Sequence, residues 1–163
     1  MKKIIIALIL FFTVCIGATS CAPKSELLSY RSAPYSLNAL LELKATGETF
    51  RITVSSDPES QSTTLVFEDS EPLSGVVFTM CQEEMLVRHA DKEYPAEDFI
   101  YIKEVFGLLN ADENDFVSAE SSKAGQIHVN VLKFKGERIL ILESKSKMPL
   151  SFEGPHIKIS VTR

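Results

Sequence analysis

Residues 37–54 read LNALLELKATGETFRITV, and this stretch decides the fold class. Apolar side chains stand at every second position on both sides of the turn-forming residues 46–48. That spacing is the repeat of a β-strand with one buried face, whereas a helix repeats its apolar residues at three and four positions. The stretch therefore predicts two antiparallel strands, over residues 37–44 and 50–55, joined by a turn.

The alternation continues after this hairpin and predicts a larger sheet. Turn-forming residues separate the first five alternating segments at a spacing of about ten residues, which is typical of an antiparallel meander. After an interruption the alternation resumes, with a tight turn at Lys135-Gly136-Glu137. The sequence thus predicts a mainly β (α+β) domain of about ten strands. Beyond the first hairpin, the expected strands cover residues 63–68, 76–81, 85–89, 116–120, 127–131, 138–143, 148–152 and 157–161.

One principal helix is expected in the interruption. Pro95 with Glu97 and Asp98 is typical of a helix start, where carboxylates meet the positive end of the helix dipole. The helix should run from there to Leu109. Because it is apolar around more than half of its circumference, it should pack into a concave partner. Its apolar stripe consists of Phe99, Ile102, Phe106 and Leu109, widened by Tyr101, Val105 and Leu108.

The first residues of the chain have the layout of a bacterial export signal. Lys2 and Lys3 precede the apolar run 4–17, which is short for a membrane span of roughly 20 residues. The small residues 18–20 then precede Cys21, an arrangement that resembles a lipoprotein processing site. We expect residues 1–20 to be removed and Cys21 to carry acyl chains, which a palmitate analogue would label. The alternative is an ordinary secreted protein with an unmodified Cys21.

The expected domain organisation follows from that processing. Residues 21–36 are polar and contain Pro23 and Pro34, which favours a tether. Residues 37–163 form one domain. Acyl chains on Cys21 would anchor this domain to the bacterial cell membrane from the extracytoplasmic side.

Composition and charge exclude several classes of protein. The chain has 163 residues, of which 45% are hydrophobic and 24% charged, and its net charge is −5. These values argue against a disordered tail, a multi-span membrane protein and a nucleic-acid partner. Residues 21–122 carry 7 Lys and Arg against 19 Asp and Glu, whereas residues 123–163 carry 8 against 3. The basic C-terminal strands either neutralise acidic neighbours, which we favour, or offer a basic face to an anionic partner.

No pattern typical of an enzyme or a metal site is present. His89, His128 and His156 lack metal-ligand spacing, and we expect them on strand surfaces. No serine stands in a Gly-x-Ser-x-Gly motif, and there is no glycine-rich phosphate loop. Cys81 lies in an apolar stretch without a flanking base, so we expect a buried structural cysteine rather than a nucleophile. We therefore expect no catalysis, no metal and no cofactor.

The order of these elements resembles a known superfamily. Its landmarks here are the segments LVFE at 65–68, PLSGVVF at 72–78 and MPLSF at 148–152. On them the chain resembles the LolA/LolB lipoprotein superfamily, which includes the GerS-like small lipoproteins of Gram-positive bacteria. The resemblance implies a curved antiparallel sheet, or incomplete β-barrel, with the helix packed in its concave side. In the carriers of that superfamily the space between sheet and helix holds acyl chains.

Two functions of different classes are compatible with this interpretation. The first is a non-enzymatic lipoprotein that binds a lipid or other apolar ligand in the groove between sheet and helix. The second is a structural or protein-interaction lipoprotein of the cell envelope with a filled core. A cavity large enough for an acyl chain would favour the first function. The residues expected to line such a groove are Phe50, Ile52, Leu65, Phe67, Phe78, Met80, Phe99 and Phe106.

Overall fold

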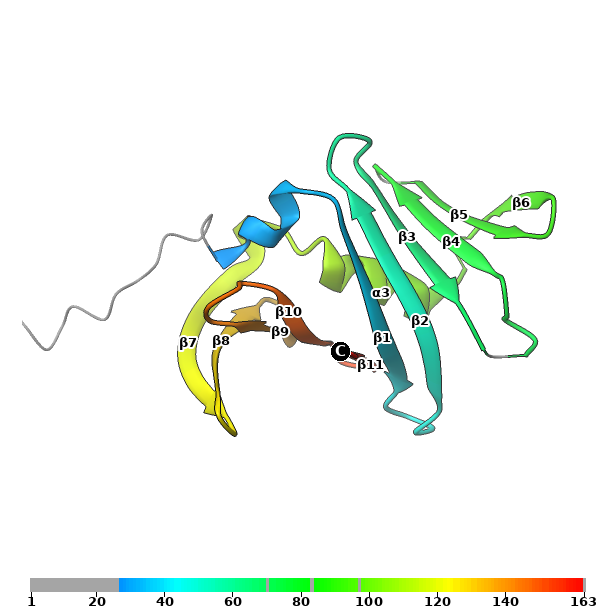
Figure 1. Ribbon diagram of the computed structural model, residues 1–163. Helices are drawn as coiled ribbons and strands as arrows, with labels where there is room; N and C mark the ends of the chain where they lie inside the picture. The colour runs from blue at the N-terminus through cyan, green and yellow to red at the C-terminus, as the bar shows by residue number, and fades with distance from the viewer. Residues whose placement is uncertain (1–26, 70, 83, 97, 163) are drawn as a thin grey trace, which may run out of the picture.

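The computed structural model describes residues 27–69, 71–82, 84–96 and 98–162 (Figure 1). The expected signal peptide, residues 1–20, and the expected lipidation site, Cys21, lie outside the described residues. Within the described part of the chain, no helix has the length and hydropathy that a membrane span requires.

Among the described residues, eleven strands form one antiparallel sheet, which confirms the predicted fold class. The count is one higher than expected because Lys92–Pro95 forms a short extra strand, β6. The other strands of the first half are β1 (Tyr35–Leu43), β2 (Thr49–Asp57), β3 (Ser62–Phe67), β4 (Val77–Cys81) and β5 (Glu84–His89). Those of the second half are β7 (Phe116–Ala124), β8 (Ile127–Phe134), β9 (Arg138–Glu143), β10 (Pro149–Glu153) and β11 (Ile157–Val161).

The sheet consists of two meanders joined through the first and last strands. Its strand order is β6-β5-β4-β3-β2-β1-β11-β10-β9-β8-β7. β1 pairs with β11, and Leu41 lies opposite Ile159 in that pair. Figure 1 shows the sheet curving around the helix α3 (Ile100–Leu109), with its two ends apart. The result is an open, curved sheet that does not close into a barrel.

The helix α3 begins later than predicted. It starts at Ile100, whereas the sequence placed the helix start at Pro95. Pro95 instead ends β6, where it lies opposite Leu86. A short edge strand tolerates proline because part of its backbone has no strand partner. The predicted start was wrong because proline and acidic residues mark the end of an edge strand as readily as the start of a helix.

The core lies between the concave face of the sheet and α3. Every second residue of the central strands is buried, as the alternation predicted; in β1 these are Leu37, Ala39 and Leu41. The helix contacts β9, β10 and β11, so it packs in the concave side of the sheet. Its buried residues are Ile102, Val105, Phe106, Leu108 and Leu109.

The described part of the expected tether packs against the domain. Leu27, Leu28 and Tyr30 are buried, beside or within the short 3-10 helix η1 (Ser29–Ser32). Arg31 Nη1 donates a 2.6 Å hydrogen bond to the carbonyl oxygen of Ala111, just beyond the end of α3. The packed region therefore begins at least as early as Leu27, ahead of the expected domain start at residue 37.

Cys81 is exposed, so the prediction of a buried cysteine was wrong. It is the last residue of β4, and strand alternation places it on the opposite face from the buried Phe78. The apolar stretch that contains Cys81 reflects two different faces of one strand rather than a single buried run. Its Sγ lies 3.9 Å from the carbonyl oxygen of Ser60.

Basic residues of the C-terminal strands pair with acidic residues of the preceding segment. Lys133 Nζ lies 2.8 Å from Glu120 Oε1, and Lys135 and Arg138 both contact Asp115. The hydrogen bond from Arg138 holds the pKa of the Asp115 carboxyl below its ordinary value. For these three cations, the neutralising arrangement that we favoured is the one the structure has.

Candidate ligand groove

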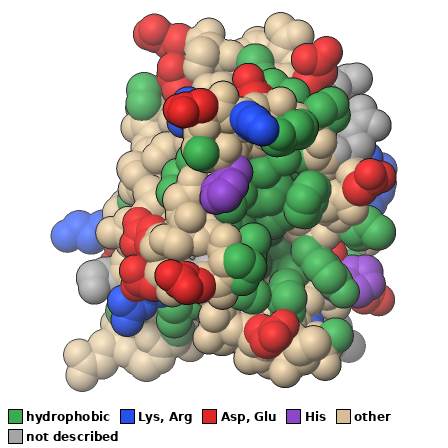
Figure 2. All heavy atoms as spheres, turned by 90° about the vertical axis from the view of Figure 1, so that its right-hand side faces the viewer, with side chains coloured by type: hydrophobic (Ala, Val, Ile, Leu, Met, Phe, Trp, Pro, Cys, Tyr) green, Lys and Arg blue, Asp and Glu red, His purple; other side chains and the backbone are tan. Residues whose placement is uncertain are grey.

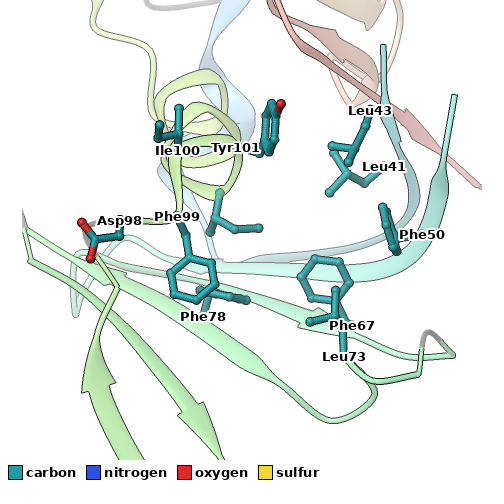
Figure 3. Close-up of a pocket in the computed structure, with 11 residues that line it drawn as sticks. Leu41, Leu43, Phe50, Phe67, Leu73, Phe78, Asp98, Phe99, Ile100 and Tyr101 are labelled. Carbon is teal, nitrogen blue, oxygen red and sulfur yellow. The ribbon is translucent and has the colours of Figure 1, made fainter. Parts of the chain in front are cut away.

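A cavity of about 330 Å³ opens where α3 begins, between that end of the helix and the strands β1–β4 (Figure 3). Four strands, the loop between β3 and β4, and the first turn of α3 contribute side chains to it. It is a groove between sheet and helix, as the resemblance implied. The lining residues are Leu41, Leu43, Phe50, Phe67, Leu73, Phe78, Asp98, Phe99, Ile100, Tyr101 and Ile102.

Four phenylalanine rings form a row along the groove. The ring centroids of Phe50 and Phe67 lie 5.7 Å apart, those of Phe67 and Phe78 lie 6.1 Å apart, and those of Phe78 and Phe99 lie 5.1 Å apart. All three contacts are edge-to-face, which is a favoured geometry for aromatic pairs. The row links three strands to the start of the helix and gives the groove a continuous apolar wall.

Strand register brings these side chains to one face of the sheet. Phe50 lies opposite Leu41 in the β1–β2 pair, and Phe67 lies opposite Ile52 in the β2–β3 pair. Opposite residues of an antiparallel pair point to the same face, as do residues two apart along one strand. The period of two in the sequence is therefore what lines one side of the groove with apolar side chains.

Exposure rises steeply from the floor of the groove to its mouth. Leu41, Phe67 and Phe78 on the floor are at most 3% exposed. At the mouth, in contrast, Phe99 is 45% exposed and Ile100 is 71% exposed. Figure 2 shows hydrophobic side chains gathered in one continuous area on the side of the molecule where α3 begins. The groove is thus an apolar space that opens onto an apolar surface.

Polar groups are confined to the rim of the groove. Asp98 carries the one charged side chain among the described lining residues, and Tyr101 carries a phenolic hydroxyl. The Tyr101 ring contacts that of His156 at 6.3 Å between centroids. Glu104 holds His156 in place: it accepts a 3.0 Å hydrogen bond from the backbone N–H and lies 2.8 Å from Nδ1.

The lining of the groove is suited to burying apolar surface. An apolar lining rewards the burial of apolar surface and offers a polar ligand no hydrogen bonds in the interior. The described lining residues include no Ser, Cys, His or Lys, and their ionisable groups are the Asp98 carboxylate and the Tyr101 phenol. Among the described residues, no group of three or more His, Cys, Asp and Glu side chains could hold a metal ion. His89, His128 and His156 are all exposed.

The eight residues proposed from the sequence fall into two groups. Phe50, Phe67, Phe78 and Phe99 line the groove. Ile52, Leu65 and Phe106 are at most 1% exposed and belong to the filled core, while Met80 is half-buried against that core. Ile52 lies opposite the lining residue Phe67, and Leu65 lies opposite the lining residue Phe78, so lining and core residues are neighbours on the concave face. The two-residue alternation of apolar side chains assigns a residue to the concave face of the sheet. It does not say whether that residue lines the groove or belongs to the core.

Sequence reasoning missed several lining residues. Leu41 and Leu43 stand in the alternating segment that decided the fold, yet neither was among the eight residues expected to line the groove. Tyr101 was expected only as part of the apolar stripe of the helix, and Ile100 was not singled out, yet both line the groove. Leu73 lies in the loop after β3, where no repeat signals its position.

A second hollow is polar and lies on the outer face of β1–β3. Its volume is about 600 Å³ and its lining is rich in hydroxyls, including Ser36, Ser55 and Thr64. Ser55 Oγ donates a 3.0 Å hydrogen bond to Ser36 Oγ, so these hydroxyls already satisfy one another. It is wide and open to solvent, and we do not consider it a binding site.

Comparisons with known proteins support the fold and leave the ligand open. A crystal structure of an uncharacterized conserved protein from Thermus thermophilus is similar to this chain, with a TM-score of 0.52 at 13% identity. The match covers 85% of this chain and 79% of that one. At so low an identity, this similarity shows a shared fold and nothing about activity.

A crystal structure of a LolA superfamily protein from Nitrosomonas europaea is also similar, over 83% of this chain and 73% of that one. Its TM-score is 0.41 at 8% identity, which is too low to establish a common fold. No protein-family model matches the chain. No curated protein matches it at a significant level.

Proposed function

We propose that this chain is a membrane-anchored extracytoplasmic lipoprotein that binds an alkyl or acyl chain in the groove between α3 and strands β1–β4. One observation carries the proposal: a continuous apolar wall, built around four Phe rings, encloses a cavity that opens to the surface. Protein cores are close-packed, with few voids larger than a water molecule, so a cavity of this volume is not expected from core packing alone. The protein acts by binding and not by catalysis.

The size of the groove suits one chain rather than a whole lipid. Small-molecule pockets range from roughly 300 to 1,000 Å³, and the groove lies near the lower end with about 330 Å³. Each buried CH₂ group contributes about 0.8 kcal/mol, so a chain of several CH₂ groups gains enough to bind without any polar contact. The head group of such a ligand would remain at the mouth.

The anchoring part of the proposal rests on the sequence. Lys2 and Lys3, the apolar run 4–17 and the small residues before Cys21 favour export and lipidation. The packed region includes Leu27, so only residues 22–26 separate it from Cys21. Fully extended, so short a segment spans about 20 Å, which would keep the domain close to the membrane surface. The resemblance to the LolA/LolB superfamily supports the same interpretation.

A protein-interaction role in the cell envelope is the second candidate. The exposed apolar rim favours it, because large exposed apolar patches often mark protein contacts. In this alternative the rim would meet an envelope protein and the groove would hold part of that partner. The two candidates differ in whether an isolated apolar molecule binds.

Fluorescence titration separates these candidates. The fragment 23–163 contains every packed residue that the structure describes, and it should bind an uncharged alkyl-linked fluorophore with saturation. Leu43→Trp places a larger side chain in the groove and should weaken binding at least about tenfold. Leu40→Trp is the matched control, because Leu40 lies on the outer face of the same strand and should leave binding unchanged.

Two outcomes would overturn the binding role. Absence of saturable binding by the unmodified fragment would favour the protein-interaction candidate. Equal weakening by both Trp variants would mean that the fluorophore does not bind in the groove. Native mass spectrometry of the fragment, purified without detergent, provides an independent measurement, because a retained lipid adds a discrete mass that organic extraction removes.

The anchor has its own test. Cys21→Ala in the full chain should release the protein from membranes and abolish labelling by a palmitate analogue. Membrane partition and labelling that are unchanged by this substitution would contradict lipidation at Cys21 and favour an ordinary secreted protein.

A further inference from the structure

We propose that the turn between β10 and β11, residues 154–156, braces the two walls of the groove, and that His156 and Glu104 position Tyr101 for ligand binding. This inference rests on the proposed function and adds the residues that keep the binding site preformed. The residues of the turn and Glu104 do not line the groove, so they act on a ligand only through the walls.

The turn is bonded to the helix wall of the groove. Glu104 Oε1 accepts a 3.0 Å hydrogen bond from the backbone N–H of His156, and Glu104 Oε2 lies 2.8 Å from Nδ1 of the same residue. The Glu104 side chain is only 14% exposed. An ionised carboxylate only accepts hydrogen bonds, so Nδ1 carries the proton in this contact. One carboxylate thus fixes both the backbone and the ring of His156 against α3.

The same turn is bonded to the sheet wall of the groove. Lys44 directly follows the lining residue Leu43 at the end of β1, and its backbone N–H donates a 2.8 Å hydrogen bond to the carbonyl oxygen of His156. Lys44 Nζ also lies 2.7 Å from Oε1 of Glu153, the last residue of β10. His156 is therefore bonded on one side to α3 and on the other to the end of β1, which are opposite walls of the groove.

Close packing of the turn on α3 fixes the position of the helix wall. A Cβ on Gly154 would collide with Glu104 Oε1 and would lie 3.2 Å from Leu108 Cδ1. No space for a further methyl group remains between the turn and this part of the helix. Because such packed contacts yield little, the helix cannot move toward the turn and widen the groove.

Tyr101 connects this brace to the ligand. It lines the groove, and in Figure 3 its ring lies on the side of α3 toward Leu43. The ring packs edge-to-face against that of His156, with the centroids 6.3 Å apart. Tyr101 is 44% exposed, so burial alone does not hold its ring. Ordering a free side chain weakens binding by about two- to tenfold, and a ring that His156 already holds avoids this loss.

The first experiment removes the His156 ring and keeps its backbone bonds. In the fragment 23–163, His156→Ala should weaken binding of the uncharged alkyl-linked fluorophore by about three- to tenfold. His128→Ala is the matched control, because His128 is an exposed residue of β8 that does not line the groove. This control should leave the affinity unchanged.

A double-mutant cycle shows whether His156 acts through Tyr101. In a Tyr101→Ala background, His156→Ala should change the affinity by less than about twofold, because no ring remains to be positioned. A general loss of structure would instead weaken binding equally in both backgrounds. Glu104→Gln keeps hydrogen-bonding groups that Glu104→Ala lacks, so it should recover most of the affinity that Glu104→Ala loses.

The outcomes separate this inference from the proposed function. If the unmodified fragment binds the fluorophore and His156→Ala binds it equally well, the brace has no role and the groove still binds alkyl chains. If His156→Ala weakens binding equally with and without the Tyr101 ring, His156 does not position Tyr101 and the inference is wrong. If the unmodified fragment does not bind the fluorophore, the proposed function fails and this inference fails with it.

Discussion

The two ends of α3 differ in packing although both are rich in apolar residues. From Val105 to Leu109 the inward residues of the helix are at most 3% exposed, and the helix contacts β9–β11. At its beginning, Ile100 is 71% exposed and faces a cavity over β1–β4. Exposed apolar residues beside a cavity add little to stability, and this contrast separates the proposed binding region from the packed core.

The largest expected effect is at the closed end. Phe106→Ala removes a ring that is 1% exposed and should lower the free energy of unfolding by about 3–5 kcal/mol. The matched change at the open end, Phe99→Ala, should cost about 1 kcal/mol, because that ring is already 45% exposed. Urea denaturation measures both values. Equal losses would mean that the two ends are equally packed.

The second effect tests how closely the helix approaches the sheet. A Cβ on Gly154 would collide with Glu104 Oε1 and lie 3.2 Å from Leu108 Cδ1, and the hydrogen bonds to His156 hold Glu104 in place. Gly154→Ala should therefore destabilise the fold by about 1–3 kcal/mol. Gly107→Ala, on the exposed side of α3 with no atom near its Cβ, should instead stabilise it by about 0.5–1 kcal/mol. Thermal unfolding of the pair measures the contrast, and a stabilised Gly154→Ala would show that this contact is loose.

A third effect concerns Tyr35, the first residue of β1. Its ring packs against that of Tyr30, with the ring centroids 5.5 Å apart. Burial raises the pKa of Tyr35 from 10.0 to about 12. Because the folded state holds this proton more tightly than the unfolded state, the stabilisation is complete below about pH 10 and is lost as the pH rises toward 12.

Tyr35→Phe should flatten that alkaline decline and cost about 1 kcal/mol at neutral pH, because a hydroxyl with a hydrogen-bond partner is lost. Urea denaturation across the alkaline range measures the slope, and phenolate absorbance reports the titration directly. An unchanged slope in Tyr35→Phe would assign the decline to other groups.

The smallest expected effect on stability is at the mouth. Ile100→Ser should change the free energy of unfolding by no more than about 0.5 kcal/mol, because the side chain is 71% exposed. The same substitution should weaken fluorophore binding severalfold, since it removes apolar surface from the rim. Denaturation and fluorescence titration on one preparation give both numbers. A large loss of stability would place Ile100 in the core rather than in the binding surface.

The concave face was predictable from the sequence, whereas the part of it that stays uncovered was not. Strand alternation correctly assigned Phe50, Phe67 and Phe78 to the concave face together with Ile52 and Leu65. Whether each residue lines the groove depends on where α3 begins and how it crosses the sheet. Pro95 misled the prediction of that start, because its local signal fits a strand end as well.

The sequence by itself determined the β class, the tight turn at Gly136 and the amphipathic helix, because each depends on residues close together in the chain. Gly136 and Glu137 both have positive φ, at 72° and 59°, in the three-residue turn between β8 and β9. The tertiary structure alone decided the pairing of β1 with β11, the exposure of Cys81 and the opening at Ile100. Those features depend on how strongly the sheet curves around the helix. The curvature arises from the combined twist and bending of all eleven strands of the described chain, and no local sequence pattern encodes it.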